Sequence, residues 1–216
     1  MQRLLSTAVL AAPLAALSLV ALWPAQPAAA DAFVVNLTTD QADLNAGDGR
    51  CDINADLGVE DCTLRAAIGE ANFTIAFDMI TFSTCGPIAP AAALPDISNP
   101  VSIDGSCTPG PRAELVGGGP AEGTDGLRLV AGSDGSTIRD LVIRGWIGVP
   151  ADGIEVNSDD NFILGNFLGV TASGEAASAN VRGVHVSGGT NNTIGGTTIA
   201  DRNVISGNSG VGGGAP

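Results

Sequence analysis

Three short segments repeat one pattern, in which a glycine opens a run of alternating aliphatic and charged or titratable residues: GLRL from residue 126, GIEV from residue 153 and GVHV from residue 183. Because successive side chains of a strand point to opposite faces, we expect Arg128, Glu155 and His185 to face outward, one above another. A carboxylate between a guanidinium and an imidazole could carry out general acid–base chemistry or contact a ligand. The favoured interpretation is a structural charge ladder, which contributes at most about 1 kcal/mol per pair.

Two adjacent carboxylates, Asp159 and Asp160, are the second candidate for chemistry, because glycosidases use a pair of carboxyl groups. Neighbouring residues of a strand point to opposite faces, however, so a polar turn explains this pair better. The sequence has no G-x-S-x-G motif and no P-loop lysine, and its one histidine cannot serve both a nucleophilic triad and a metal site. The sequence therefore contains no complete catalytic constellation.

An acidic stretch near the N-terminus could bind calcium. Asp52, Asn54 and Asp56 offer oxygen ligands at alternate positions, as the start of a calcium loop does. For an EF-hand, Gly58 comes one residue late, and Thr63 stands where the bidentate glutamate belongs. Two interpretations stay open, a calcium site of another kind and an acidic loop without metal. We expect the protein to require no cofactor.

The first thirty residues have the features of a secretory signal peptide. Arg3 supplies a positive charge, an uncharged apolar run extends to Leu22, and an A-x-A cleavage site ends at Ala30. The apolar run is long enough to span a bilayer, so a membrane anchor is the alternative. We expect a secreted or cell-surface protein that meets a membrane only through this leader.

Four cysteines, Cys51, Cys62, Cys85 and Cys107, all follow the leader. An even number of cysteines in an exported chain favours disulfides over thiols or a metal site. Three pairings are open, and we expect the local one, Cys51 with Cys62 and Cys85 with Cys107, because it closes short loops. Zinc is the disfavoured alternative, since the sequence has no C-x-x-C motif.

The amino-acid composition argues against some classes of binding partner. The 216 residues carry 23 carboxylates against nine arginines, with no lysine, and the formal net charge is −14. We therefore expect no nucleic-acid binding, because that affinity depends on clustered cations. Thirty glycines and 4% aromatic residues predict many turns around a core of small and branched aliphatic side chains.

The element that precedes the glycine-led segments is a short helix. Leu64, Ala67, Ile68 and Ala71 follow the helical period and form one apolar face, Thr63 or Asp61 can cap its start, and Asn72 can end it. Strands are expected at 33–39, around 80–82 and around 101–103, where apolar residues alternate with polar ones.

The glycine-led segments recur at intervals of 27 and 30 residues, and each is followed by a polar turn. The turns are expected to place Asp134, Asp160 and Asn191 in one column. A repeat of this length, with strands and turns in phase, predicts a solenoid of short strands.

The segment CTLRAAIGEAN (residues 62–72) resembles the CSLREA motif of exported bacterial proteins, with Thr63 in place of serine and Ala66 in place of glutamate. ALPDISNPVSIDGSC and GTNNTIGGTTIADRNVISGNSG resemble the right-handed parallel β-helix repeats that commonly follow this motif. The resemblance covers about residues 33–216. It implies an all-β, pectate-lyase-like solenoid with a short N-terminal helical and disulfide-bearing cap, divided into a leader (1–30), a cap region (31–77) and β-helix coils (78–216).

The resemblance also implies a surface or secreted scaffold, because similar solenoids include adhesins and carbohydrate-active enzymes. We expect non-catalytic adhesion or carbohydrate contact, with a polysaccharide lyase or glycoside hydrolase of the β-helix class as the alternative. The partner would be a polysaccharide or another cell-surface ligand. The last residues, GVGGGAP, begin a fourth glycine-led unit, so we also expect further coils or a docking chain at that end.

Overall fold

Parallel strands and one helix make up the computed structural model, which describes residues 29–55, 60–107, 110, 112–118, 121–149 and 151–210. All but the last two residues of the expected leader lie outside these ranges, and so does Asp56. Within the described ranges, no helix is long and apolar enough to cross a bilayer.

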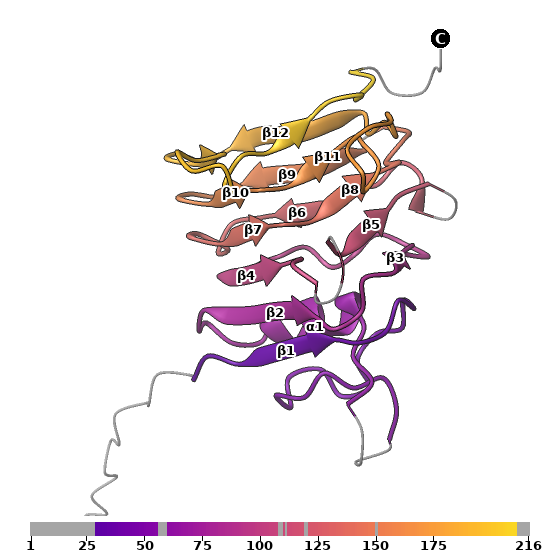
Figure 1. Cartoon of the computed structure of the whole chain (residues 1–216). Helices are drawn as coiled ribbons and strands as arrows, with labels where there is room; N and C mark the ends of the chain where they lie inside the picture. Colours follow the sequence, from indigo (N-terminus) through magenta and orange to yellow (C-terminus); the bar gives the residue numbers. More distant parts are fainter. Residues whose placement is uncertain are drawn as a thin grey trace, which may run out of the picture.

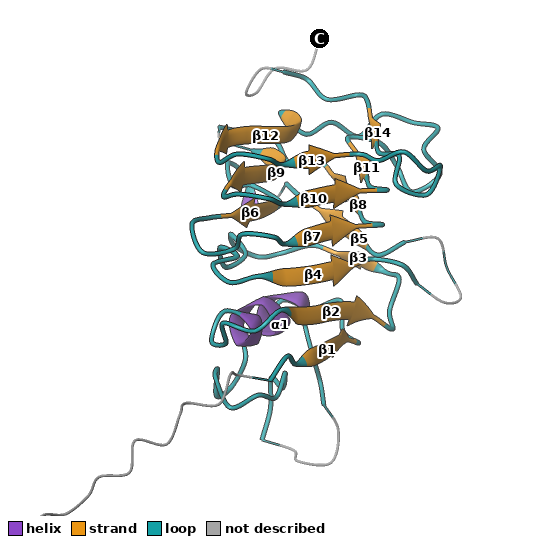
Figure 2. Cartoon of the chain, turned by 90° about the vertical axis from the view of Figure 1, so that its left-hand side faces the viewer, coloured by secondary structure: helices purple, strands orange, loops and turns teal. Residues whose placement is uncertain are grey.

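The strands form three sheets, and every pair of neighbouring strands is parallel (Figures 1 and 2). The six-stranded sheet contains, in order, β1 (Ala32–Val35), β2 (Asp78–Phe82), β4 (Val101–Asp104), β7 (Thr137–Arg139), β10 (Phe162–Leu164) and β13 (Thr193–Ile194). The five-stranded sheet contains β3 (Pro87–Ile88), β5 (Glu114–Val116), β8 (Val142–Arg144), β11 (Phe167–Leu168) and β14 (Val204–Ile205). The three-stranded sheet contains β6 (Leu127–Leu129), β9 (Asp152–Asn157) and β12 (Arg182–Gly188).

From β6 onward, consecutive strands visit the three sheets in turn, so that each round of three strands lies against the round before it (Figure 1). The glycine-led segments of the sequence are β6, β9 and β12, which form one sheet in register. The expectation of a mostly β fold with a short helix is confirmed at this level.

A ladder of isoleucines fills the space behind the six-stranded sheet. The strand register aligns Ile80, Ile103, Ile138 and Ile163, and all four side chains are fully buried. Burial of one such side chain contributes about 1.5–3 kcal/mol, so the ladder is a main source of stability. Ile194 continues it on β13 but is 45% exposed, because β13 is the edge strand of the sheet.

Asparagines hold the corners between the sheets. The Asn166 side chain accepts a hydrogen bond from the Leu141 N–H at 3.0 Å and donates one to the Ile138 carbonyl at 2.9 Å, both in the preceding round. Asn161 and Asn180 likewise accept from backbone N–H groups of the preceding round. All three side chains are buried, so these bonds satisfy backbone groups that water cannot reach.

The expected column of turn residues is one residue out of phase. The Asp159 N–H donates to Asp134, and the Thr190 N–H donates to Asp159, so the aligned residues are Asp134, Asp159 and Thr190. Counting residues from each repeat glycine gave the wrong alignment because the connecting lengths differ. The chain from the end of β6 to Asp134 is longer than the chain from the end of β9 to Asp159. Asp160 and Asn191 instead share a left-handed backbone conformation, with φ of 59° and 58°.

The predicted helix is confirmed as α1 (Leu64–Ala71), with Thr63 as its N-cap. The Thr63 hydroxyl accepts a hydrogen bond from the Ala66 N–H at 3.1 Å. The predicted apolar face is buried against β1 and β2 at the N-terminal end of the stack (Figure 2). The helix therefore covers the apolar side chains of β1 and β2 at this end of the stack.

The predicted disulfide pattern is confirmed in part. Cys51 and Cys62 are joined, and both are buried beside α1. The expected second disulfide is not formed: Cys85 and Cys107 are thiols in hydrogen-bond contact. Burial, together with that contact, raises the pKa of Cys107 to about 12, which stabilises the protonated thiol.

Candidate functional site

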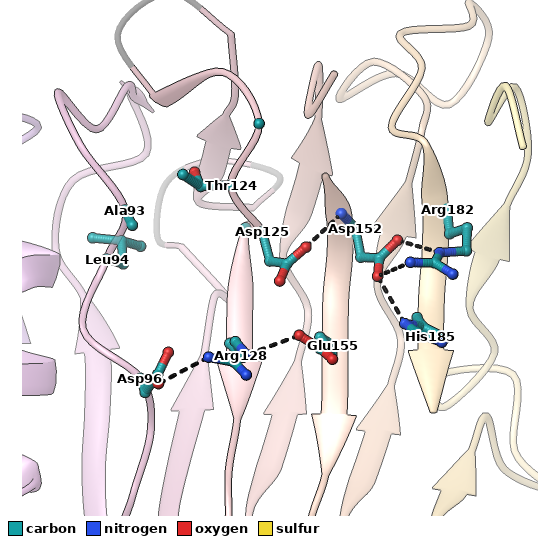
Figure 3. Close-up of a pocket in the computed structure, with 12 residues that line it drawn as sticks. Ala93, Leu94, Asp96, Thr124, Asp125, Arg128, Asp152, Glu155, Arg182 and His185 are labelled. Carbon is teal, nitrogen blue, oxygen red and sulfur yellow. Dashed lines mark hydrogen bonds and ion pairs between the residues drawn. The ribbon is translucent and has the colours of Figure 1, made fainter. Parts of the chain in front are cut away.

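A groove of about 500 Å³ opens on the outer face of the three-stranded sheet (Figure 3). Its floor is formed by outward side chains of β6, β9 and β12, and residues 93–96 and 123–126 complete its wall. The three strands are parallel and paired in register, so outward side chains of neighbouring strands lie one strand spacing apart. Charged side chains from the three strands and from the two connecting segments therefore lie together in the groove.

The expected outward column lies along this groove, in register. Arg128 is opposite Glu155, and Glu155 is opposite His185. The Arg128 guanidinium donates from Nε to Glu155 Oε2 at 2.8 Å and pairs through Nη1 with Asp96 Oδ2 at 3.1 Å. The hydrogen bond to Glu155 and the charge of Asp96 raise the pKa of Arg128. Arg128 thus joins β9 to the 93–96 wall.

His185 contacts a different carboxylate from the one expected. Its Nδ1 lies 3.0 Å from Asp152 Oδ2, and Arg182 binds the same carboxylate through Nε at 2.5 Å and Nη2 at 2.8 Å. The Asp152 side chain is only 1% exposed, so Arg182 compensates a buried negative charge, and the His185 ring adds a hydrogen-bonding contact to the same oxygen. Glu155 is instead held by Arg128 and by the Ser187 hydroxyl at 2.8 Å.

Of the titratable residues that line the groove, Asp125 has the largest pKa shift. Its carboxyl accepts the Asp152 N–H at 2.8 Å and is hydrogen-bonded to the Glu155 carboxyl. Burial is the largest cause that raises the pKa of Asp125 to about 6, the Asp152 N–H opposes this, and the contact with Glu155 adds to it. Burial also raises the pKa of Glu155, but hydrogen bonds from Ser187, Asp125 and Arg128 outweigh it and hold that pKa below its ordinary value. As pH falls through about 6, Asp125 is therefore the first of the two carboxyl groups to take up a proton, while at neutral pH both are ionised.

The geometry argues against cleavage of a glycosidic bond by this pair. Glycosidases separate their two carboxyl groups by about 5 Å or more, so that the sugar, and in inverting enzymes a water, fits between them. A side-chain hydrogen bond between Asp125 and Glu155 contributes to the pKa shift of each, so each carboxyl group is already engaged by the other. What the groove offers is a row of oriented hydrogen-bonding groups, fixed by ion pairs, which suits the hydroxyl groups of a ligand.

Sequence reasoning found Arg128, Glu155 and His185 and missed Asp96, Asp125, Asp152 and Arg182. The signal for three of the missed residues lies beside the repeat glycines, because Asp125, Asp152 and Arg182 each immediately precede the glycine of their segment. These residues form a second column in the groove, parallel to the first. Asp96 has no such periodic signal, since it comes from a connecting segment.

The repeat glycines themselves allow the strands to approach one another. A Cβ atom on Gly126 would lie 2.5 Å from the Gly153 carbonyl oxygen, and one on Gly153 would lie 2.7 Å from the Gly183 carbonyl oxygen. Such contacts are too close for any side chain, so glycine at this phase is required for the sheet that carries the groove.

The calcium hypothesis gains no further support from the described residues. Asp52 is buried and pairs with Arg50 at 3.0 Å, while the Asn54 amide donates to Asp61 at 2.6 Å. Asp56, the third expected ligand, lies outside the described residues. Among the residues that the structure places, no group of three or more histidine, cysteine or acidic side chains is arranged to hold a metal ion.

Two other sequence features belong to the scaffold. Asp159 accepts hydrogen bonds from the Thr190 N–H and hydroxyl, as a stacked turn residue would. Trp146 is fully buried, so its indole packs in the core and offers no platform to a sugar.

Comparison of the chain with protein-family models, with curated proteins and with solved structures found no match.

Proposed function

We propose that this chain is a right-handed parallel β-helix scaffold, secreted or at the cell surface, that contacts carbohydrate at the β6–β9–β12 groove without cleaving it. Three parallel sheets visited in turn, with asparagine ladders at their corners, support the β-helix assignment. The leader-like residues 1–30, the Cys51–Cys62 disulfide and the resemblance of residues 62–72 to the CSLREA motif support export.

One observation carries the binding proposal: the polar side chains of the groove are already fixed in place by their own ion pairs. Arg128 is held from two sides, and Arg182 makes a two-point contact with Asp152. A site whose side chains are ordered before binding loses less conformational entropy when a ligand arrives. Saccharides present many hydroxyl groups at fixed spacing, which matches such a row of oriented donors and acceptors.

The alternative, a polysaccharide lyase or glycoside hydrolase, has one observation in its favour. Asp125 and Glu155 are a titratable pair in a groove with oppositely shifted pKa values, and such pairs occur at active sites. The side-chain hydrogen bond between them favours binding over cleavage, because each carboxyl group is already engaged by the other.

A glycan array tests the binding proposal, and a reducing-sugar assay on the same glycans tests the alternative. The informative variant is Ala93→Trp, which places an indole in the wall of the groove. The matched control is Ala92→Trp, because the Ala92 and Ala93 carbonyls both accept from Arg65 and both residues are exposed, yet Ala92 does not line the groove.

We expect the wild type and Ala92→Trp to bind the same glycans, Ala93→Trp to lose at least tenfold in affinity, and no reducing ends to appear. If no glycan binds, or if Ala93→Trp binds as the wild type does, the proposal is wrong. Release of reducing ends that Ala93→Trp abolishes would establish the enzymatic alternative instead.

A further inference from the structure

Acidic side chains outnumber arginines among the described residues that line the groove. Asp96, Asp125, Asp152 and Glu155 face two guanidinium groups, those of Arg128 and Arg182, and one imidazole, that of His185, among the described lining residues. At neutral pH the carboxylates therefore outnumber the guanidinium groups. The whole chain, with a net charge of −14, adds to the negative potential.

Both guanidinium groups are already occupied. Arg182 neutralises Asp152, whose side chain is buried, and Arg128 binds Asp96 and Glu155. A carboxylate or sulfate on a ligand would compete with Asp96, Asp152 and Glu155 for these guanidinium groups and would lie beside their negative charges, and any loss of its pair is costly for the buried Asp152. The arginines therefore act as structural clamps of the groove and are not free receptors for an anion.

Asp125 has no cation of its own among the ion pairs of the described residues. Its partners are the Asp152 N–H and the Glu155 carboxyl. It lies on the segment that leads into β6, between the 93–96 wall and β9, in the middle of the groove (Figure 3). An anionic ligand would meet this carboxyl directly, whereas a hydroxyl group could donate a hydrogen bond to it.

We infer that the groove selects saccharides that carry no carboxylate or sulfate group, and that the Asp125–Glu155 carboxyl pair sets this selectivity. The inference rests on the proposed function, since it names the ligand class of the same groove. It separates this protein from a receptor for acidic polysaccharides such as polygalacturonate.

The experiment compares an array of neutral, amino, uronate and sulfated oligosaccharides, with affinities measured by titration calorimetry at pH 7 and low ionic strength. The test variant is Asp125→Asn, which keeps the shape of the side chain and removes its charge. The control is Glu114→Gln, which removes one charge from a carboxylate that pairs with Arg144 on the five-stranded sheet, outside the groove. Circular dichroism and melting curves verify that both variants fold.

We expect the wild type and Glu114→Gln to bind saccharides without acidic groups and to bind uronate and sulfated ones much more weakly. Asp125→Asn is expected to gain affinity for uronate oligomers by about tenfold, the effect of one nearby charge at intermediate dielectric, with a smaller change for neutral ones.

Equal or tighter binding of uronate or sulfated oligomers by the wild type would overturn the inference and leave the proposed function in place. The same gain in Glu114→Gln as in Asp125→Asn would remove Asp125 as the determinant. Absence of binding to every glycan would overturn the proposed function itself.

Discussion

At the scale of single residues, the charge of the groove depends on how burial and neighbours shift the pKa values of Asp125 and Glu155. The two carboxyl groups differ little in chemistry, yet of the two only Glu155 accepts hydrogen bonds from Arg128 and Ser187. Glu155 is therefore the stable anion, and Asp125 is the first to take up a proton as pH falls, with its pKa raised from 3.8 to about 6. The same logic assigns distinct roles to paired carboxyl groups in many proteins.

The raised pKa of Asp125 predicts a pH dependence of stability. An acid with a higher pKa in the folded state stabilises the fold below its unfolded pKa and loses this contribution as pH rises through the folded pKa. The free energy of unfolding of the wild type should thus fall, relative to Asp125→Asn, as pH rises from about 4 to about 7. Chemical denaturation at several pH values measures this difference, and a constant difference across the range would contradict the raised pKa of Asp125.

Replacing the corner asparagines with alanine should lower the free energy of unfolding by amounts that depend on how buried each asparagine is. Asn166→Ala removes two hydrogen bonds to buried backbone groups, at Leu141 and Ile138, and should cost about 1–3 kcal/mol of unfolding free energy. Asn203→Ala removes the equivalent bonds one round later, where the side chain is partly exposed, and should cost less. Equal losses in urea denaturation would show that the ladder does not act through burial.

At the scale of elements, the helix could be predicted closely, with its start left open between Thr63 and Asp61 as the cap, while the strands could only be located. The apolar face and the cap of α1 are encoded within about ten consecutive residues, so local sequence determines both ends. The strand expected at 33–39 ends at Val35, because the Asn36 and Leu37 N–H groups donate to the Cys62 carbonyl and leave the sheet. That partner is distant in sequence and gives no local signal.

Some residues of the candidate site could likewise be predicted from local sequence, and others could not. Its first column, with Arg128 and Glu155, follows from side-chain alternation on a strand. The partner of His185 could not be predicted, because the three-dimensional neighbours Asp152 and Arg182 lie beside glycines, where the alternation of a regular strand breaks down. A residue such as Asp96, on a connecting segment, becomes part of the groove only once the fold is formed.

The cap helix yields a prediction of its own. Thr63→Ala removes the N-cap hydrogen bond to Ala66 and a second bond to the Gln41 carbonyl, and should lower the free energy of unfolding by about 1–2 kcal/mol. Thr63→Ser keeps the hydroxyl group and should lose less than half as much. Thermal or urea unfolding of the two variants compares them, and a larger loss for serine than for alanine would exclude the capping role.

At the scale of the whole molecule, burial changes along the stack of rounds. The isoleucine ladder is dry from Ile80 to Ile163, and its last member, Ile194, is half-exposed on the edge strand. Ile163→Ala should therefore cost about 2–5 kcal/mol, and Ile194→Ala should cost less than half of that. Denaturation of the two variants checks this, and equal losses would mean that Ile194 is as well covered as Ile163.

The stack also explains how one short sequence pattern creates a groove lined by charged side chains. Each glycine-led segment supplies one outward side chain to each of two columns, and stacking places residues that are about 27–30 positions apart within hydrogen-bond distance. We propose that carbohydrate binds at this surface.

The most direct test is carbon-13 NMR of the side-chain carboxyl groups while a glycan selected on the array is added. We predict shifts at Asp125, Asp152 and Glu155, which line the groove, and none at Glu114 and Asp134, which lie outside it. Shifts at Glu114 or Asp134 with unchanged groove carboxyls would contradict the account, because they would place the saccharide on another face of the molecule.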